Sequence, residues 1–88
     1  MRLEADRSYT VFHLLNNVKH IASKSMKEYE AFLDPDQFYR SHPSHIINLT
    51  QVVRMVSSEG LFVQMTDGSM PELLKRNKQI FLEKLKGL

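Results

Sequence analysis

The stretch that most constrains the fold is residues 38–49, where an aromatic pair leads into a polar cluster and then into an apolar tail. Its two ends can be buried, whereas its middle offers hydrogen-bonding groups and one fixed positive charge. The apolar members are Phe38, Tyr39, Ile46, Ile47 and Leu49, and the polar members are Arg40, Ser41, His42, Ser44, His45 and Asn48. This pattern predicts a polar turn held between two hydrophobic segments.

Short strand-like runs separated by turn signals make up much of the remaining chain. The predicted strands are residues 3–5, 8–15, 18–22, 52–57, 61–66 and 69–73. The pair Asn16-Asn17 tolerates positive φ and predicts a hairpin between the second and third runs. Residues 58–60 and the pair Asp67-Gly68 predict two further turns. The resulting pattern is an antiparallel meander.

Two helices are predicted. Ser25 and Glu28 have the spacing of a capping box, which places the start of the first helix at Ser25. Its apolar face is Met26, Tyr29, Phe32 and Leu33. The pair Asp34-Pro35 ends this helix, because the residue before proline is pushed out of the helical region. The second helix is predicted over residues 75–85, with Ile80, Phe81 and Leu85 on one face, Leu88 just beyond and Gly87 as a stop.

The predicted fold class is mostly β (α+β), with short antiparallel strands in small sheets, one internal helix and one C-terminal helix. Residues 1–88 have the length of a single small domain. There is no cysteine for a disulfide or a thiolate zinc site, and no apolar run long enough for a bilayer span. We therefore expect a cytoplasmic domain without membrane contact.

No pattern in the chain predicts an enzyme, a cofactor or a metal centre. His42 and His45 have the spacing of a ligand pair, but Pro43 between them indicates a turn and no carboxylate lies close by in the sequence. Ser41 and Ser44 stand beside these histidines without the strand-turn-helix elbow of a nucleophile. The three glycines stand at turn or cap positions, so no glycine-rich phosphate loop is present.

The distribution of charge is uneven although the net charge is only +2. Residues 28–36 hold four acids and no base, whereas residues 75–86 hold five bases and one acid. Lys75, Arg76 and Lys78 fall at the start of the terminal helix, where the helix dipole disfavours cations by about 0.3–1 kcal/mol each. Either an anionic partner such as a nucleic-acid backbone offsets this cost, or the side chains are simply solvated.

Four segments together resemble the LytTR DNA-binding domain of bacterial response regulators. Residues 38–49 resemble the family's F-x-R-x-H-R-S-x-I-V-N-L-like run, and residues 4–9 resemble its E-A-x-x-N/S-Y turn. Residues 23–28 resemble its S-L-K-E helix start, and residues 67–71 its D-G-x-x-I-P turn. The resemblance implies a fold of short antiparallel strands that reads double-stranded DNA through loops.

The resemblance also implies which residues contact DNA. The implied contacts are Arg7, Ser8 and Tyr9 in a first loop, His42 and Ser44 in a second, and Lys75, Arg76 and Asn77 in a third. Arg40 and Asn48 also match patterned positions, where they either contact DNA or hold the second loop. The implied function is sequence-specific binding to promoter repeats by the output domain of a two-component transcription regulator.

Two departures from the family pattern bear on this function. Pro43 replaces a basic or polar residue, which removes a side-chain contact and an amide donor. Residues 72–74 replace small and polar residues, and Lys75 stands where arginine is usual. The alternative is therefore a protein-interaction or dimerisation module on the same fold with weakened DNA binding.

The resemblance carries two further expectations about the context of the domain. The family's upstream strand is not found before Leu3, so we expect a domain cut from a longer regulator with an upstream receiver or sensor domain. A homodimer on DNA is one assembly that fits repeat-containing sites.

Overall fold

The computed structural model describes residues 2–14, 16 and 18–88 and contains mostly β-strands. The strands are β1 (Arg2–Asp6), β2 (Tyr9–His13), β3 (Lys19–Ala22), β4 (Phe38–His42), β5 (His45–Asn48), β6 (Val52–Ser57) and β7 (Leu61–Met65). The helices are α1 (Met26–Glu30) and α2 (Lys78–Lys86), and the 3₁₀ turns η2 (Leu49–Gln51) and η3 (Lys75–Asn77) precede β6 and α2. The predicted fold class is confirmed.

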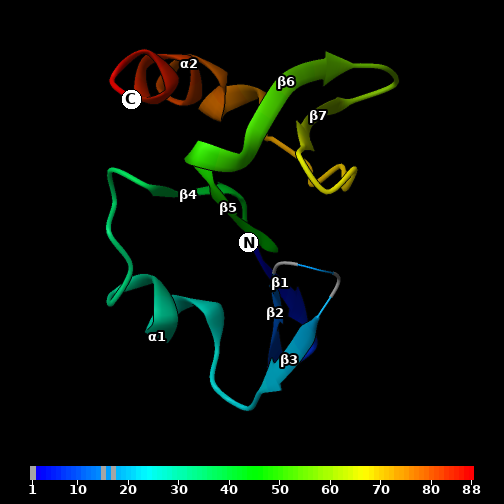
Figure 1. Ribbon diagram of the computed structural model, residues 1–88, viewed down its shortest axis with the longest axis vertical. Coiled ribbons are helices and arrows are strands. Elements are labelled where there is room, and N and C mark those ends of the chain that lie inside the picture. Colours follow the sequence, from blue (N-terminus) through cyan, green and yellow to red (C-terminus); the bar gives the residue numbers. More distant parts are fainter. Residues whose placement is uncertain (1, 15, 17) are drawn as a thin grey trace.

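The strands form one five-stranded and one two-stranded antiparallel sheet. The order in the larger sheet is β3-β2-β1-β5-β4, and β6 pairs with β7 in the smaller one. Figure 1 shows α2 beside the smaller sheet at one end of the molecule and α1 toward the opposite end, with β4 and β5 between the two helices. None of the helices in the described part of the chain is long and apolar enough to cross a membrane.

Two separate hydrophobic cores lie on the two faces of β5. Because side chains alternate along a strand, the neighbours Ile46 and Ile47 point to opposite faces. The smaller core holds the buried residues Leu3, Met26 and Ile46 beneath α1. The larger core is formed by Ile47, Leu49, Leu61, Val63, Met65, Leu73 and Phe81. The apolar tail of residues 38–49 thus joins both cores.

The central stretch folds as the hairpin of β4 and β5, with the predicted turn at Pro43 and Ser44. His42 pairs with His45 across this turn, and Tyr39 pairs with Ile47 further along. Two residues of β4 therefore lie opposite Ile46 of β5, which is the count of a β-bulge. The bulge consists of Arg40 and Ser41, whose side chains donate to Glu30 of α1 and to the Glu72 carbonyl.

The two predicted hairpins on either side of this stretch are confirmed. β2 pairs with β3 and β6 pairs with β7. In the first hairpin Asn16 has a φ of 61°, while Leu15 and Asn17 of the predicted strand and turn lie outside the described residues. In the second hairpin, Gly60 adopts a φ of 136°, a conformation that glycine tolerates better than other residues.

The predicted strand over residues 69–73 is wrong. This segment has only an isolated bridge, between Glu72 and Phe62 of β7. The Val63 amide donates to the Pro71 carbonyl at 2.9 Å, but proline has no amide with which to return a bond. A continuous ladder therefore does not form beside β7.

The helix α1 is shorter than predicted. Ser25 is its N-cap residue, but no side chain caps the helix, so the predicted capping box is not formed. The amides of Phe32 and Leu33 donate to the carbonyls three residues earlier, as in a 3₁₀ turn. This tighter winding turns Phe32 outward to 87% exposure, so its predicted burial is wrong, whereas Tyr29 and Leu33 pack against the smaller core.

The terminal helix is divided at Lys78, because residues 75–77 form the separate turn η3. Phe81 is fully buried, and Leu82 and Leu85 pack around the same core. Ile80 is half exposed, since successive helical residues are rotated by 100° and the buried face is centred on Phe81. Its predicted place in the buried face is therefore wrong.

Candidate nucleic-acid interface

The first predicted contact loop is the turn between β1 and β2. Arg7, Ser8 and Tyr9 are all exposed there, and half of the Tyr9 surface is accessible. Arg7 has a φ of 56°, a left-handed conformation that is unusual for a residue other than glycine. This turn therefore presents a cation, a hydroxyl and an aromatic ring to the surroundings.

The second loop is the turn between β4 and β5. The Ser44 amide donates to His42 Nδ1 at 3.0 Å, so this nitrogen acts as an acceptor and a neutral ring carries its proton on Nε2. That Nε2 lies 3.5 Å from Oε2 of Glu72. Pro43 is exposed between His42 and the half-buried Ser44. The imidazole thus supports the turn and is partly exposed.

Arg40 connects this turn to α1. Its guanidinium donates to Glu30 of α1 at 3.2 Å and to the Pro43 carbonyl at 2.8 Å. The Nε atom is buried without a hydrogen-bond partner. These contacts give Arg40 a role in holding the turn against α1.

Asn48 is almost fully buried at the end of β5. Its Oδ1 accepts hydrogen bonds from the Thr50 amide at 3.0 Å and from the Thr50 hydroxyl at 2.7 Å. It is thereby the N-cap of η2, a common role for asparagine. Its side chain supports the chain reversal into β6 and is not presented to a partner.

The third loop comprises residues 72–77, before α2. Lys75 and Arg76 are exposed, and Asn77 is half-buried, with its amide group donating to the Ser41 carbonyl at 3.3 Å. Leu73 is buried in the larger core, and its amide donates to Leu61 of β7 at 2.9 Å. The side chain of Leu73 is therefore an internal anchor and is not available as part of a partner interface.

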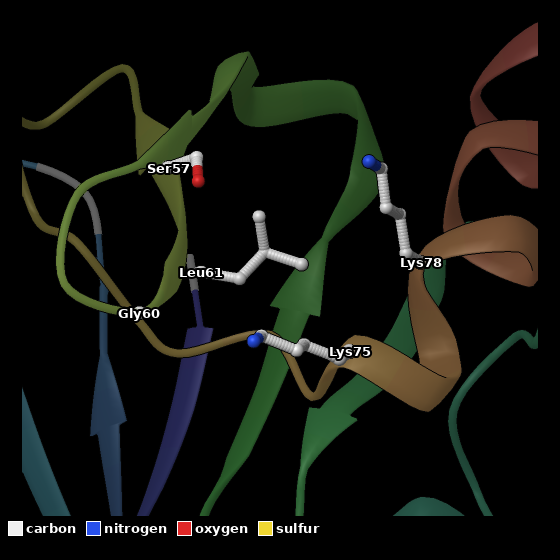
Figure 2. A pocket seen from close by; sticks show the side chains of 5 residues that line it. All are labelled: Ser57, Gly60, Leu61, Lys75 and Lys78. Atoms are coloured by element: carbon white, nitrogen blue, oxygen red, sulfur yellow. The ribbon is translucent and has the colours of Figure 1, made fainter.

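A hollow of about 270 Å³ lies between the third loop and the β6–β7 hairpin. It is lined by Ser57, Gly60, Leu61, Lys75 and Lys78, and no acidic residue is among these lining residues. Figure 2 shows both lysines extending from η3 and the start of α2 toward the hairpin. This hollow has the charge and hydroxyl group that suit an anion.

The three loops are held together by hydrogen bonds between neighbouring segments. The Ala5 amide, just before the first loop, donates to the Ser44 carbonyl of the second at 2.8 Å. The Leu74 amide, in the third loop, donates to the Ser41 carbonyl at 2.9 Å. The fold therefore gathers segments that are about 70 residues apart in the chain, with the second loop between the other two.

Titratable groups lie on the sheet face beside the second loop. Burial is the main cause that lowers the pKa of His45, and its Nδ1 has no hydrogen-bond partner. Burial alone would raise the pKa of Glu4, but the hydrogen bond from His13 at 2.9 Å and the charge of Arg2 outweigh it and lower this pKa. The described residues contain no cluster of three acidic, histidine or cysteine side chains suited to a metal ion.

The predicted site residues do not include Ser41, Ser57 or Lys78, and the first two have no signal in the sequence. Ser41 belongs to the polar middle of residues 38–49, but no sequence signal indicates that it binds the third loop. Ser57 faces Lys75 and Lys78 across the hollow, and it comes from a strand with no recognition motif. Lys78 had a signal, since it belongs to the basic group at the start of the terminal helix.

Comparison with known proteins gives a consistent result. A family model described as the LytTr DNA-binding domain matches residues 1–86. The chain is similar to a solved structure, the LytTr DNA-binding domain of a protein described as a methyl-accepting/DNA response regulator from Bacillus cereus. The two share 23% identity and superpose with a TM-score of 0.83 over 97% of this chain and 79% of the other. No curated protein matches the chain.

Proposed function

The chain belongs to the LytTr DNA-binding domain family, and from this premise we propose that it recognises specific DNA sequences through its three loops. The family is one of DNA-binding domains and not of enzymes. The observation that carries the proposal is the proximity of the loops: β1, just before the first loop, bonds to Ser44 of the second, and β4, just before the second, bonds to Leu74 of the third. A surface of three connected loops can follow successive grooves of a duplex.

The loops have different roles in this proposal. Lys75 and Arg76 are exposed cations and neutralise phosphates, which supplies most of the salt-dependent affinity. Tyr9 and His42 contact bases or sugars, because each is an aromatic side chain with polar atoms in a loop, exposed at Tyr9 and partly exposed at His42. Arg7, Ser8, Ser44 and Asn77 complete the contact surface, while Arg40 holds the second loop and Asn48 caps η2.

The test begins with selection of bound duplexes from a random pool, which yields an enriched site if recognition is sequence-specific. Binding of that site is then compared for wild type and the Lys75→Ala/Arg76→Ala variant over a range of salt concentrations. We expect weaker binding and a salt slope that falls by about 0.9 for each lost phosphate contact.

The matched control is Lys24→Ala/Lys27→Ala, which removes the same charge at two exposed positions next to and within α1. It should change the slope far less, because these lysines lie outside the three loops. Equal slopes for the two double variants would disprove the role of the third loop.

A regulatory role extends the proposal. The similar domain from Bacillus cereus is described as part of a response regulator, which supports a role for this chain as the output domain of a bacterial transcription regulator. In that setting an upstream receiver or sensor domain controls binding in the cytoplasm, and two copies occupy a repeated site. The test is to express the domain in cells that carry the enriched site in front of a reporter gene and to measure transcription of that gene.

The competing function is a protein-interaction or dimerisation module. It is favoured by the exposed apolar residues of the β2–β3 hairpin, where Val18 is 53% and Ile21 66% exposed. β3 is also at one end of the five-stranded sheet. Failure to enrich any sequence, with equal affinity for all duplexes at physiological salt, would favour this function over sequence recognition.

A further inference from the structure

We propose that Ser41 is a positioning residue that sets the third loop relative to the second and thereby determines DNA specificity without touching DNA. This inference rests on the proposed function. It concerns a side chain that is fully buried, in contrast to the exposed residues of the loops.

Ser41 connects to the third loop at three points. Its hydroxyl donates to the Glu72 carbonyl at 2.7 Å. Its carbonyl accepts from the Leu74 amide at 2.9 Å and from the side-chain amide of Asn77 at 3.3 Å. One residue of β4 therefore contacts the beginning, middle and end of the segment that carries Lys75 and Arg76.

The bulge in β4 explains how Ser41 makes these contacts. Arg40 and Ser41 together lie opposite Ile46, so one residue of β4 is surplus to the pairing with β5. β4 is also at an end of the sheet, where its outer side has no strand as a neighbour in the described structure. The backbone of Ser41 is thus available to residues 72–77.

The contacts of Ser41 fix the position of the third loop, whereas the attachment of this loop to the domain depends mainly on Leu73. Leu73 keeps the third loop attached to the domain, because its side chain is buried in the larger core and its amide bonds to β7. The Ser41 contacts, the Glu72 carboxylate near His42 and a longer bond from the Tyr39 hydroxyl to the Asn77 carbonyl at 3.5 Å fix the position of the loop relative to β4 and the second loop. Loss of the hydroxyl should leave the domain folded and the two loops less well aligned.

Alignment matters for specific DNA more than for random DNA. Phosphate contacts can be made in many registers, whereas base contacts require that all the loops meet one sequence together. Misalignment of two loops should therefore reduce the affinity for the enriched site and change the affinity for random duplex little. The ratio of the two affinities is the diagnostic quantity.

The experiment measures this ratio for wild type and Ser41→Ala by fluorescence anisotropy with the enriched and a random duplex. We expect the ratio to fall about fivefold to tenfold, the size expected for one lost hydrogen bond. A merely destabilising substitution lowers the folded fraction equally for both duplexes, and so leaves the ratio unchanged.

Thr10→Val is the matched control. Thr10 is also fully buried, and its hydroxyl donates to the Lys24 carbonyl at 2.7 Å, away from the second and third loops. Val keeps the shape of the side chain and removes the hydroxyl. This variant should have a comparable cost in stability and an unchanged affinity ratio.

The outcomes separate the inference from the proposed function. If no enriched duplex exists for wild type, sequence recognition itself is wrong. If wild type discriminates and folded Ser41→Ala discriminates equally well, only the role of Ser41 is wrong. Should Ser41→Ala not fold, Ser41→Cys preserves much of the volume with a weaker donor, and an unchanged ratio for this variant would overturn the inference.

Discussion

The two faces of β5 support different parts of the molecule. On the face of Ile47, seven buried residues from β5 through α2 form a continuous core that includes Leu73 of the third loop. On the face of Ile46, three buried residues form a small core. Phe12 of β2, Tyr29 of α1 and Leu33 just after α1 pack against it. The third loop thus depends on the larger core, and the first loop, between β1 and β2, on the smaller one.

This difference teaches that the proposed DNA surface is assembled from two supports that meet at β4 and β5. The second loop is supported by both cores, because β5, the strand that follows this loop, carries Ile46 and Ile47 as consecutive residues. Substitutions in one core should therefore disturb one end of the surface first.

The largest difference is expected between Phe81→Ala and Met26→Ala. Phe81 is fully buried in the larger core, and its truncation should lower the free energy of unfolding by about 3–5 kcal/mol. Met26 is also buried, but its few partners and the short α1 can close around the gap, so we expect about 2 kcal/mol. Urea denaturation followed by circular dichroism measures both, and equal costs would contradict the comparison.

The next pair concerns the caps of two helical segments. Asn48→Ala removes two hydrogen bonds to Thr50 at a buried position and should cost about 1–2 kcal/mol. Ser25→Ala should cost only a few tenths, about 0.3 kcal/mol, because the Ser25 side chain makes no capping bond. The same denaturation measurement tests this pair. A similar loss for Ser25→Ala would show that the cap forms in solution.

A smaller effect is expected for Ile47→Val and Ile46→Val, which delete one methylene from neighbouring residues. Both should cost about 0.5–1.5 kcal/mol, with Ile47 toward the upper end because its surroundings are more extensive. Thermal unfolding of the two variants side by side gives the difference. A larger cost for Ile46→Val would mean that the small core is the more tightly packed.

The smallest effect is a pH dependence of stability that involves His45. This residue lies two positions before Ile47 on β5, so the two side chains are on the same face of the strand. Burial lowers the pKa of His45 from 6.5 in the folded state, so the unfolded chain binds this proton more readily. Stability should decline as the pH falls below about 6.5, until the folded pKa is passed.

This decline should be weaker in His45→Gln than in wild type, and His20→Gln, at an exposed position of β3, should retain it. A second decline is expected below about pH 4.5, because the lowered pKa of Glu4 stabilises the fold only while that carboxylate is ionised. Unfolding at pH 7.5, 5.5 and 3.5 distinguishes the two. An unchanged decline in His45→Gln would assign it to other groups.

Local signals in the sequence predicted most of the elements. The β6–β7 hairpin follows from two β-rich runs around Gly60, and the turn at Pro43 from the polar residues between apolar ends. The errors occur where tertiary packing or a local hydrogen bond overrides periodicity. Phe32 continues the apolar face of α1 in the sequence, yet a 3₁₀ turn directs it outward. Pro71 similarly interrupts a run that otherwise resembles a strand.

The site was predicted less completely than the fold. Motif similarity predicted the loops, but it could not distinguish the partly exposed His42 from the buried Asn48, since both are polar residues of one stretch. Asn48 is turned inward because the chain reverses at η2 and needs a cap there. Such a role depends on where the backbone goes after the motif.

The sequence by itself determined where most strands and turns form, which side chains are polar, and that the chain belongs with the LytTr domains. Only the tertiary structure decided that Ile46 and Ile47 enter different cores and that Ser41 binds the Glu72 carbonyl across 31 positions of sequence. The reason is physical: turn and strand preferences act between near neighbours, whereas a contact between distant segments exists only once the sheets have packed and the bulge has released a backbone group.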